Sequence, residues 1–181
     1  IPMLSDELLK TILRKTSTFT QSGLKDLLEE KQRDGAGATL ESYLLKDKKM
    51  PEEMLYRIVA QFYKLPFVNL RDQPIRQDIL FLIPEPIAKS HGIVAFDQVD
   101  GELRVATLDP TNLQTFEFIK RKTSSKVKVY YTNPSSLETA LGQYKKSLSA
   151  ELGALTKPPE KEGEGGDTER QKLSELAEDI P

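Results

Sequence analysis

Residues 93–131 have the sequence IVAFDQVDGELRVATLDPTNLQTFEFIKRKTSSKVKVYY, and the spacing of apolar residues changes twice within this segment. Residues 93–96 and 103–107 are short apolar runs, which indicate two strands. Between them, Asp100-Gly101 can supply the positive φ values of a tight hairpin turn. The first half of the segment therefore predicts a β-hairpin.

A helix and a third strand are predicted in the second half. Leu113, Phe116 and Ile119 recur at helical spacing, so a helix over 112–122 is expected to bury them. From 126 to 131, valine and tyrosine alternate with lysine and tyrosine at the period of a half-buried strand. The chain thus passes from hairpin to helix to strand.

One more helix completes this part of the chain. Its apolar positions are Leu137, Ala140, Leu141 and Tyr144. The run from Ser135 to Glu138 has the spacing of a capping box at its start. The order ββαβα predicts a small α+β sandwich with helices on one face of a mixed sheet, which we assign to residues 66–150.

The first 65 residues are predicted to form a helical bundle of two helix-turn-helix repeats. A shift of 31 residues places apolar residues on apolar residues at seven positions. The pairs are Leu9 and Leu40, Ile12 and Tyr43, Leu13 and Leu44, Phe19 and Met50, Leu24 and Leu55, Leu27 and Ile58, and Leu28 and Val59. These positions are expected to form the core of residues 1–65.

Residues 151–181 are predicted to be a flexible acidic linker followed by the start of a truncated helix. From 156 to 170 the chain has two prolines, three glycines and many charges. A helical pattern resumes at Lys172 and stops at Pro181, which suggests a chain cut from a longer protein. Residues 154–181 carry a net charge of −4, and the remainder carries +2.

Composition excludes several classes of function. The chain has 26 Lys and Arg, 28 Asp and Glu, one histidine and no cysteine. Disulfide scaffolds, cysteine zinc sites and thiol catalysis are therefore excluded, and a single His91 cannot form a histidine-rich metal site. No concentrated positive charge points to nucleic acid, and no apolar run is long enough to span a membrane. A reducing, cytoplasmic compartment fits this composition.

The sequence contains no recognisable catalytic motif. There is no GxxxxGK[ST] phosphate loop and no GxGxxG. Adjacent carboxylates at 29–30 and 52–53 are expected on solvated helix faces, and His91 is expected at the end of a helix, where a partly positive ring is favourable. We expect no catalytic residue, no cofactor and no metal site in this chain.

Several short motifs resemble the N-terminal domain of type II secretion and type IV pilus assembly ATPases. The motifs occur in the family's order over most of the chain. They are LPFVNL (65–70), LIPEPIA (82–88), HGIVAF (91–96), VATLDPT (105–111) and LETAL (137–141), and the tail LSELAEDIP (173–181) resembles the entry to the next domain.

This resemblance implies that the parent protein is a hexameric cytoplasmic ATPase. ATP and Mg would bind in a downstream domain that this chain lacks. The N-terminal region would dock on the cytoplasmic domain of an inner-membrane platform or adaptor protein and regulate the motor. The chain would then be peripheral to the inner membrane through its partners.

Some members of the family bind cyclic di-GMP through the helical repeats, with arginine, glycine and glutamine at fixed positions. None of these residue types is present in this chain at the corresponding positions of either copy. In the first copy the positions hold Leu8, Lys10, Ser17 and Lys31, and in the second they hold Thr39, Glu41, Lys48 and Phe62.

Three hypotheses about function remain open at this point. The first is a non-catalytic docking and regulatory domain of a pilus-assembly or secretion ATPase. The alternative is a cyclic di-GMP sensor, which the substituted positions disfavour because arginine pairs with phosphate and stacks on guanine. The third is an ATP-independent scaffold unrelated to secretion, whose parent would lack a downstream phosphate loop.

Overall fold

The computed structural model describes residues 4–156, and of residues 150, 151 and 156 it describes the backbone alone. The chain divides into two units, with the boundary between Leu148 and Ser149. Residues 151–156, predicted as linker, are the last residues of helix α8 (Pro134–Thr156). The rest of the predicted linker and the truncated helix lie outside the described residues. The boundary predicted at residues 65 and 66 falls inside the first unit and stays a prediction.

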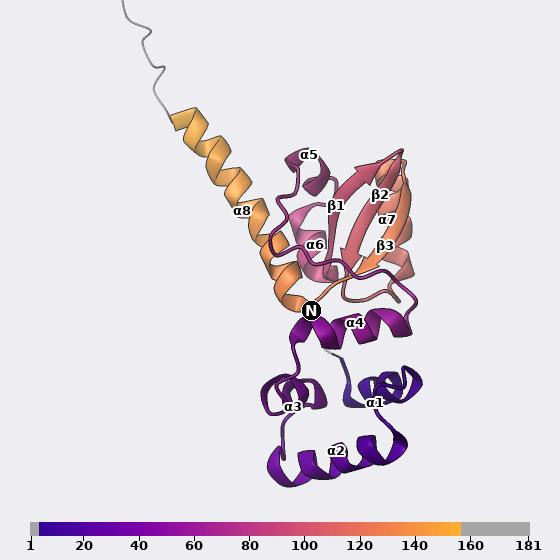
Figure 1. Cartoon of the computed structure of the whole chain (residues 1–181). Helices are drawn as coiled ribbons and strands as arrows, with labels where there is room; N and C mark the ends of the chain where they lie inside the picture. Colours follow the sequence, from indigo (N-terminus) through magenta and orange to yellow (C-terminus); the bar gives the residue numbers. More distant parts are fainter. Residues whose placement is uncertain (1–3, 157–181) are drawn as a thin grey trace, which may run out of the picture. The chain divides into compact units, whose positions relative to one another are not determined.

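Four helices form the N-terminal part: α1 (Asp6–Lys15), α2 (Gln21–Asp34), α3 (Leu40–Lys46) and α4 (Glu52–Phe62) (Figure 1). The 31-residue repeat is visible in the starts of α2 and α4, because their N-caps, Thr20 and Pro51, are 31 residues apart. The hydroxyl group of Thr20 accepts a hydrogen bond from Gly23 N–H, whereas Pro51 provides no side-chain cap.

Apolar side chains of all four helices form one core with the rest of the first unit. Contacts of α1 with α3 and α4 hold the two repeats together, and α4 also contacts strand β3 (Lys126–Tyr131). The backbone N–H of Leu40 donates to the carboxylate of Asp6 over 2.8 Å and adds a polar link between the repeats. The fully buried residues of the repeats include Leu9, Ile12, Leu13, Leu40, Leu44, Leu55 and Val59.

The apolar composition of residues 67–70 predicts a short strand, but the structure has only a single bridge there. Phe67 pairs in parallel with Tyr131, the last residue of β3. Val68 N–H donates to the Tyr131 carbonyl over 2.9 Å, but Leu70 N–H donates instead to the hydroxyl group of Ser136 in α8. Because the N–H of Leu70 donates to α8 instead of to β3, the segment does not continue as a strand.

The second part of the unit contains a three-stranded sheet. After α5 (Gln77–Leu80) and α6 (Glu85–His91) come β1 (Ile93–Val99), β2 (Glu102–Thr107), α7 (Leu113–Thr123), β3 and α8. The sheet order is β1-β2-β3, with β1 and β2 antiparallel and β2 and β3 parallel. The predicted α+β class is therefore confirmed.

The hairpin turn has the geometry that its sequence predicts. Asp100 and Gly101 have φ values of 51° and 76°, which turn β1 directly into β2. A register shift between Ala95 and Asp97 adds a bulge to β1.

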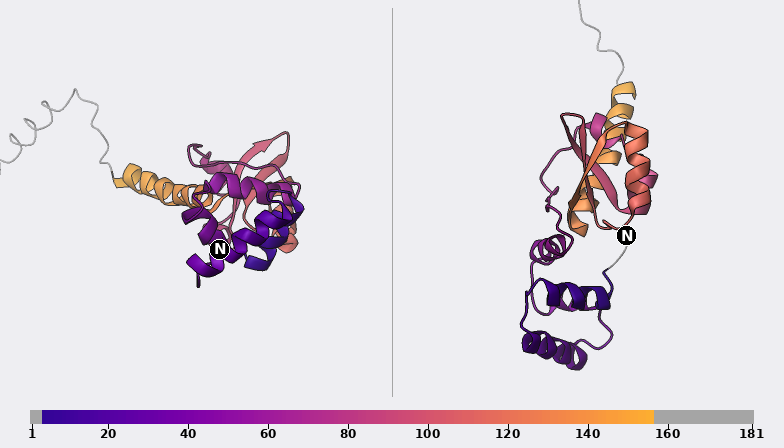
Figure 2. Two further views of the ribbon diagram at one scale, coloured as in Figure 1. Left: turned by 60° about the horizontal axis from the view of Figure 1, so that its bottom comes forward. Right: turned by 90° about the vertical axis from the view of Figure 1, so that its right-hand side faces the viewer.

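Helix α7 makes the crossover from β2 to β3 and runs along one side of the sheet (Figure 2). Its buried residues are Thr115, Phe116 and Ile119. Leu113, which was expected to be buried, is 69% exposed. It is the first residue of the helix, ahead of the stripe that packs on the core.

Candidate functional site

Helix α4 meets the end of β3 through aromatic rings. The Tyr131 ring stacks on Tyr56 with centroids 6.1 Å apart and lies 6.0 Å from the Tyr63 ring. The Tyr56 hydroxyl group donates a hydrogen bond to the Glu41 carboxylate. Burial raises the pKa of Tyr131, and burial together with this hydrogen bond raises the pKa of Tyr56. Both phenols are therefore neutral structural groups.

A polar contact joins the same two parts of the unit. The N–H and hydroxyl groups of Ser135, at the start of α8, both donate to the Glu52 carboxylate at the start of α4. The expected capping box at Ser135 is therefore wrong. Asn133 is the residue that caps α8, and its side chain accepts from Ser136 N–H over 2.9 Å. Ser135 instead donates to Glu52, which lies 83 residues earlier in the sequence.

The first copy of the cyclic di-GMP positions is only partly brought together. Lys10 and Lys31 line one hollow of about 430 Å³, together with Asp6. Lys31 forms an ion pair with Asp6 at 3.6 Å, and Lys10 with Glu7 at 2.9 Å. Leu8 instead packs against the hydrophobic core, and Ser17 lines a different groove with φ at 53°. The positive φ at Ser17 is a backbone conformation that glycine adopts more readily than serine.

Two positions of the second copy have structural roles at helix starts and helix contacts. The hydroxyl group of Thr39 caps α3 and accepts from Ser42 N–H over 3.1 Å. Glu41 accepts the hydrogen bond from Tyr56. Neither side chain is available for a ligand without breaking that contact.

The other two positions of the second copy are also engaged. Lys48 forms an ion pair and hydrogen bond with Glu30, which lowers the pKa of Glu30 and raises that of Lys48. Phe62 makes an edge contact with Tyr63, with centroids 5.1 Å apart, and Lys15 lies over its ring at 5.8 Å. The structure therefore uses all four positions of this copy to pack the helices.

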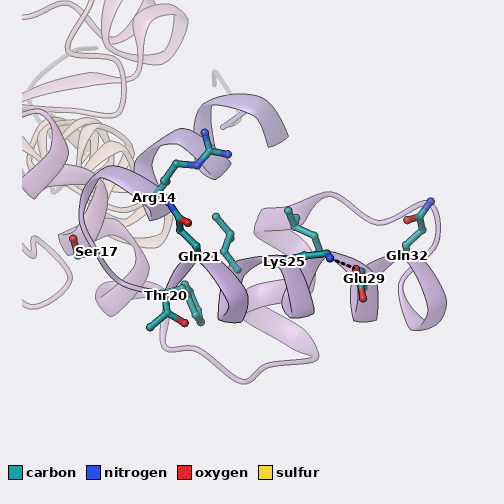
Figure 3. A pocket seen from close by; sticks show the side chains of 10 residues that line it. Arg14, Ser17, Thr20, Gln21, Lys25, Glu29 and Gln32 are labelled. Atoms are coloured by element: carbon teal, nitrogen blue, oxygen red, sulfur yellow. Dashed lines mark ion pairs between the residues drawn. The ribbon is translucent and has the colours of Figure 1, made fainter.

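A larger groove lies on the first repeat, and the sequence analysis did not identify it. Its volume is about 590 Å³. Figure 3 shows Gln21, Lys25, Glu29 and Gln32 in a row along α2, with Arg14 of α1 at one end. We call it the first-repeat groove, and its lining residues are Arg14, Ser17, Phe19, Thr20, Gln21, Leu24, Lys25, Leu28, Glu29 and Gln32.

His91 lies at the end of a helix and contacts the residue that caps another helix. It ends α6, and Gly92 follows as the C-cap in the left-handed conformation with φ at 59°. The Nδ1 atom of His91 lies 3.1 Å from the side-chain amide nitrogen of Asn112, the residue that caps α7. Within residues 4–156, no group of three or more histidine and carboxylate side chains is placed to hold a metal ion.

None of the helices in the described part of the chain combines the length and the apolar character needed to cross a membrane.

Comparison with known proteins supports the resemblance drawn from the motifs. Residues 63–151 match the model of the MshEN domain. The type IV pilus assembly ATPase PilB of Myxococcus xanthus is 25% identical over 133 residues, which cover 74% of this chain and 23% of that protein. PilB of Thermus thermophilus is 27% identical over 175 residues, which cover 96% of this chain and 19% of that protein. The chain thus spans about a fifth of the length of these relatives.

A structure of MshE shares the fold of this chain. A structure of MshE with cdg has a TM-score of 0.55 at 20% identity and covers 75% of this chain and 97% of that chain. The N-terminal domain of XpsE has a TM-score of 0.49 at 16% identity, covering 79% and 98%. The motif order, the matched segment and the fold shared with MshE agree, and residues 63–151 of this chain match the MshEN domain.

Proposed function

We propose that this chain is a non-catalytic docking and regulatory domain at the N-terminus of a hexameric type IV pilus assembly or type II secretion ATPase. It would couple the motor to the inner-membrane assembly platform. The observation that carries this proposal is the MshEN match together with the two PilB relatives, one of which covers 96% of the chain.

The chemistry of the chain supports a docking role over a catalytic one. The sequence has no phosphate loop, so ATP and Mg would bind in the remainder of the parent. Active sites gather shifted pKa values in a cleft. In this chain the phenols with strongly raised pKa, Tyr56, Tyr131 and Tyr144, are buried in the core.

The proposed partners are the cytoplasmic domain of an inner-membrane platform or adaptor protein and the rest of the parent ATPase. The chain would lie in the cytoplasm and reach the membrane through these proteins. A rigid body suits this role, because α4 is fixed to β3 and α8 by ring stacking and by the Glu52–Ser135 hydrogen bonds.

Two measurements on the chain test this proposal. ATP turnover should stay at background, and turnover above background would refute the non-catalytic role. Calorimetric titration with the purified cytoplasmic domain of the platform protein should give saturable binding. Absence of binding by folded protein would refute docking.

A second candidate function is cyclic di-GMP binding, because a structure of MshE with cdg shares the fold. The residues at the eight corresponding positions argue against it in this chain. Leu8 packs on the core, and the second-copy positions are occupied by helix caps, ion pairs and ring contacts.

A further inference from the structure

The two helical repeats present equivalent faces, of which the sheet part of the molecule covers only one. The 31-residue offset places Gln21 on Glu52, Lys25 on Tyr56, Glu29 on Ala60 and Gln32 on Tyr63. In the second repeat, Tyr56 of α4 and its C-cap residue Tyr63 contact the end of β3, and Glu52 contacts the start of α8. In the first repeat they line the first-repeat groove.

The covered face shows what this surface does when it is occupied. Tyr56 and Tyr63 contact the Tyr131 ring, and Glu52 accepts two hydrogen bonds from Ser135. Tyr56 and Ala60 are buried, at 3% and 2% exposure. The face of α4 therefore binds a polypeptide corner, in which a strand ends and a helix begins.

The equivalent face of α2 has apolar residues at the matching positions but a different rim. Phe19, Leu24 and Leu28 form an apolar floor, at positions where the second repeat has Met50, Leu55 and Val59. The rim is polar and charged, as Figure 3 shows. A surface of this kind accepts an amphipathic segment whose apolar side chains reach the floor.

Most polar side chains on the rim form no close hydrogen bond or ion pair within residues 4–156. Within residues 4–156, the side chains of Arg14, Gln21 and Gln32 form no hydrogen bond or ion pair. Lys25 reaches Glu29 only at 3.8 Å, and its side chain is 76% exposed. Two cations against one carboxylate leave the rim net positive, so it complements an acidic segment.

We propose that the first-repeat groove is the docking surface for an acidic, amphipathic segment of the platform protein. This inference rests on the proposed function and assigns it a place on the molecule. The partner segment lies along α2 as the β3–α8 corner lies along α4. Its apolar side chains contact Phe19, Leu24 and Leu28, and its carboxylates pair with Arg14 and Lys25.

Charge reversal on the rim tests the proposal. The probe is the purified cytoplasmic domain of the platform protein, titrated into the whole chain and into the double variant Arg14→Glu/Lys25→Glu. We expect the variant to bind at least about tenfold more weakly, because two attractive pairs become repulsive. The affinity of the unaltered chain should fall as salt is raised, and that of the variant should change less.

A matched control makes the same change in net charge at two lysines outside the first-repeat groove. Lys120→Glu/Lys126→Glu alters two exposed lysines of α7 and β3 and should bind as the unaltered chain does. Should the rim reversal impair folding, the neutral pair Arg14→Gln/Lys25→Gln replaces it and should weaken binding severalfold.

The outcomes separate this inference from the proposed function. Binding by the unaltered chain that is lost on rim reversal alone supports the groove. Binding that resists rim reversal, or that is lost in the control instead, overturns the groove and leaves the docking function standing. No binding by the unaltered chain refutes the docking function and the groove with it.

Discussion

The ring of Tyr56 in α4 stacks on the ring of Tyr131 at the end of β3, with centroids 6.1 Å apart and planes inclined by 20°. These rings lie where the helical repeats meet the sheet, and both are almost completely buried, at 3% and 1% exposure. Stability of the first unit should therefore depend on this pair.

Truncation of Tyr131 should be strongly destabilising. Tyr131→Ala leaves a cavity against Tyr56 and Tyr63, and removal of a buried aromatic ring costs about 3–5 kcal/mol of unfolding free energy. Urea denaturation followed by circular dichroism measures this loss. Tyr130→Ala is the control, since Tyr130 is half-buried and contacts Phe96 instead. An equal loss in both variants would contradict a special role for the Tyr56–Tyr131 stack.

The tyrosines should also control stability at alkaline pH. Burial raises the pKa of Tyr56, Tyr131 and Tyr144 above the ordinary value of 10.0. A raised folded-state pKa contributes stability that is complete below pH 10 and is lost as the pH rises towards the folded-state value. Unfolding free energy should therefore fall above about pH 10.

Ultraviolet absorbance of ionised phenol measures this effect directly. On raising the pH, these three tyrosines should ionise late and together with the loss of folded circular dichroism. In Tyr144→Phe, which also loses the hydrogen bonds from its hydroxyl group to the Leu80 and Ile83 carbonyls, one late-ionising group should disappear. Ionisation of all tyrosines near pH 10 in folded protein would show that the phenols are accessible.

The sequence predicted those features that depend on local spacing. The offset of 31 residues was recognised from apolar positions alone, and α2 and α4 do start at equivalent residues. The Asp100-Gly101 turn and the helix end at His91 were also predicted correctly, because their backbone geometry is set by adjacent residues.

Features that depend on distant partners were missed. Ser135 has the local pattern of a helix cap, but Glu52 competes for its donors and Asn133 becomes the cap. Residues 67–70 have the composition of a strand, yet Ser136 takes the N–H of Leu70. The first-repeat groove could have been found from the repeat itself, since Lys25 and Glu29 stand where the other copy has Tyr56 and Ala60.

Gly92, which lies between α6 and β1, should tolerate substitution poorly. Its φ of 59° is left-handed, whereas an added Cβ would meet only Leu137 at an ordinary 3.6 Å. Gly92→Ala should therefore cost about 1 kcal/mol through backbone strain. Gly142→Ala is the matched control: it lies inside α8 with open space around its Cβ, and should stabilise by about 0.5–1 kcal/mol. Thermal unfolding of both variants tests this prediction. A shift of both melting temperatures in the same direction would contradict the explanation.

The chain should not bind cyclic di-GMP with useful affinity. Leu8 and Thr39 stand where relatives have arginines, and they can neither pair with phosphate nor stack on guanine. The loss of two charged hydrogen-bond partners at about 1.5–3 kcal/mol each weakens binding by roughly two to four powers of ten. Calorimetric titration should therefore show no saturable heat at micromolar ligand. Binding in the low-micromolar range would show that Lys10 and Lys31, or other residues, replace the arginines.

Competition with the parent ATPase tests the docking role most directly. The full-length ATPase is bound to the immobilised cytoplasmic domain of the platform protein, and the present chain is added at increasing concentration. If docking resides in this chain, it should displace the ATPase completely, and Arg14→Glu/Lys25→Glu should displace it only at far higher concentration. Retention of the ATPase at a saturating concentration of the unaltered, folded chain would show that the motor docks through another part of the molecule.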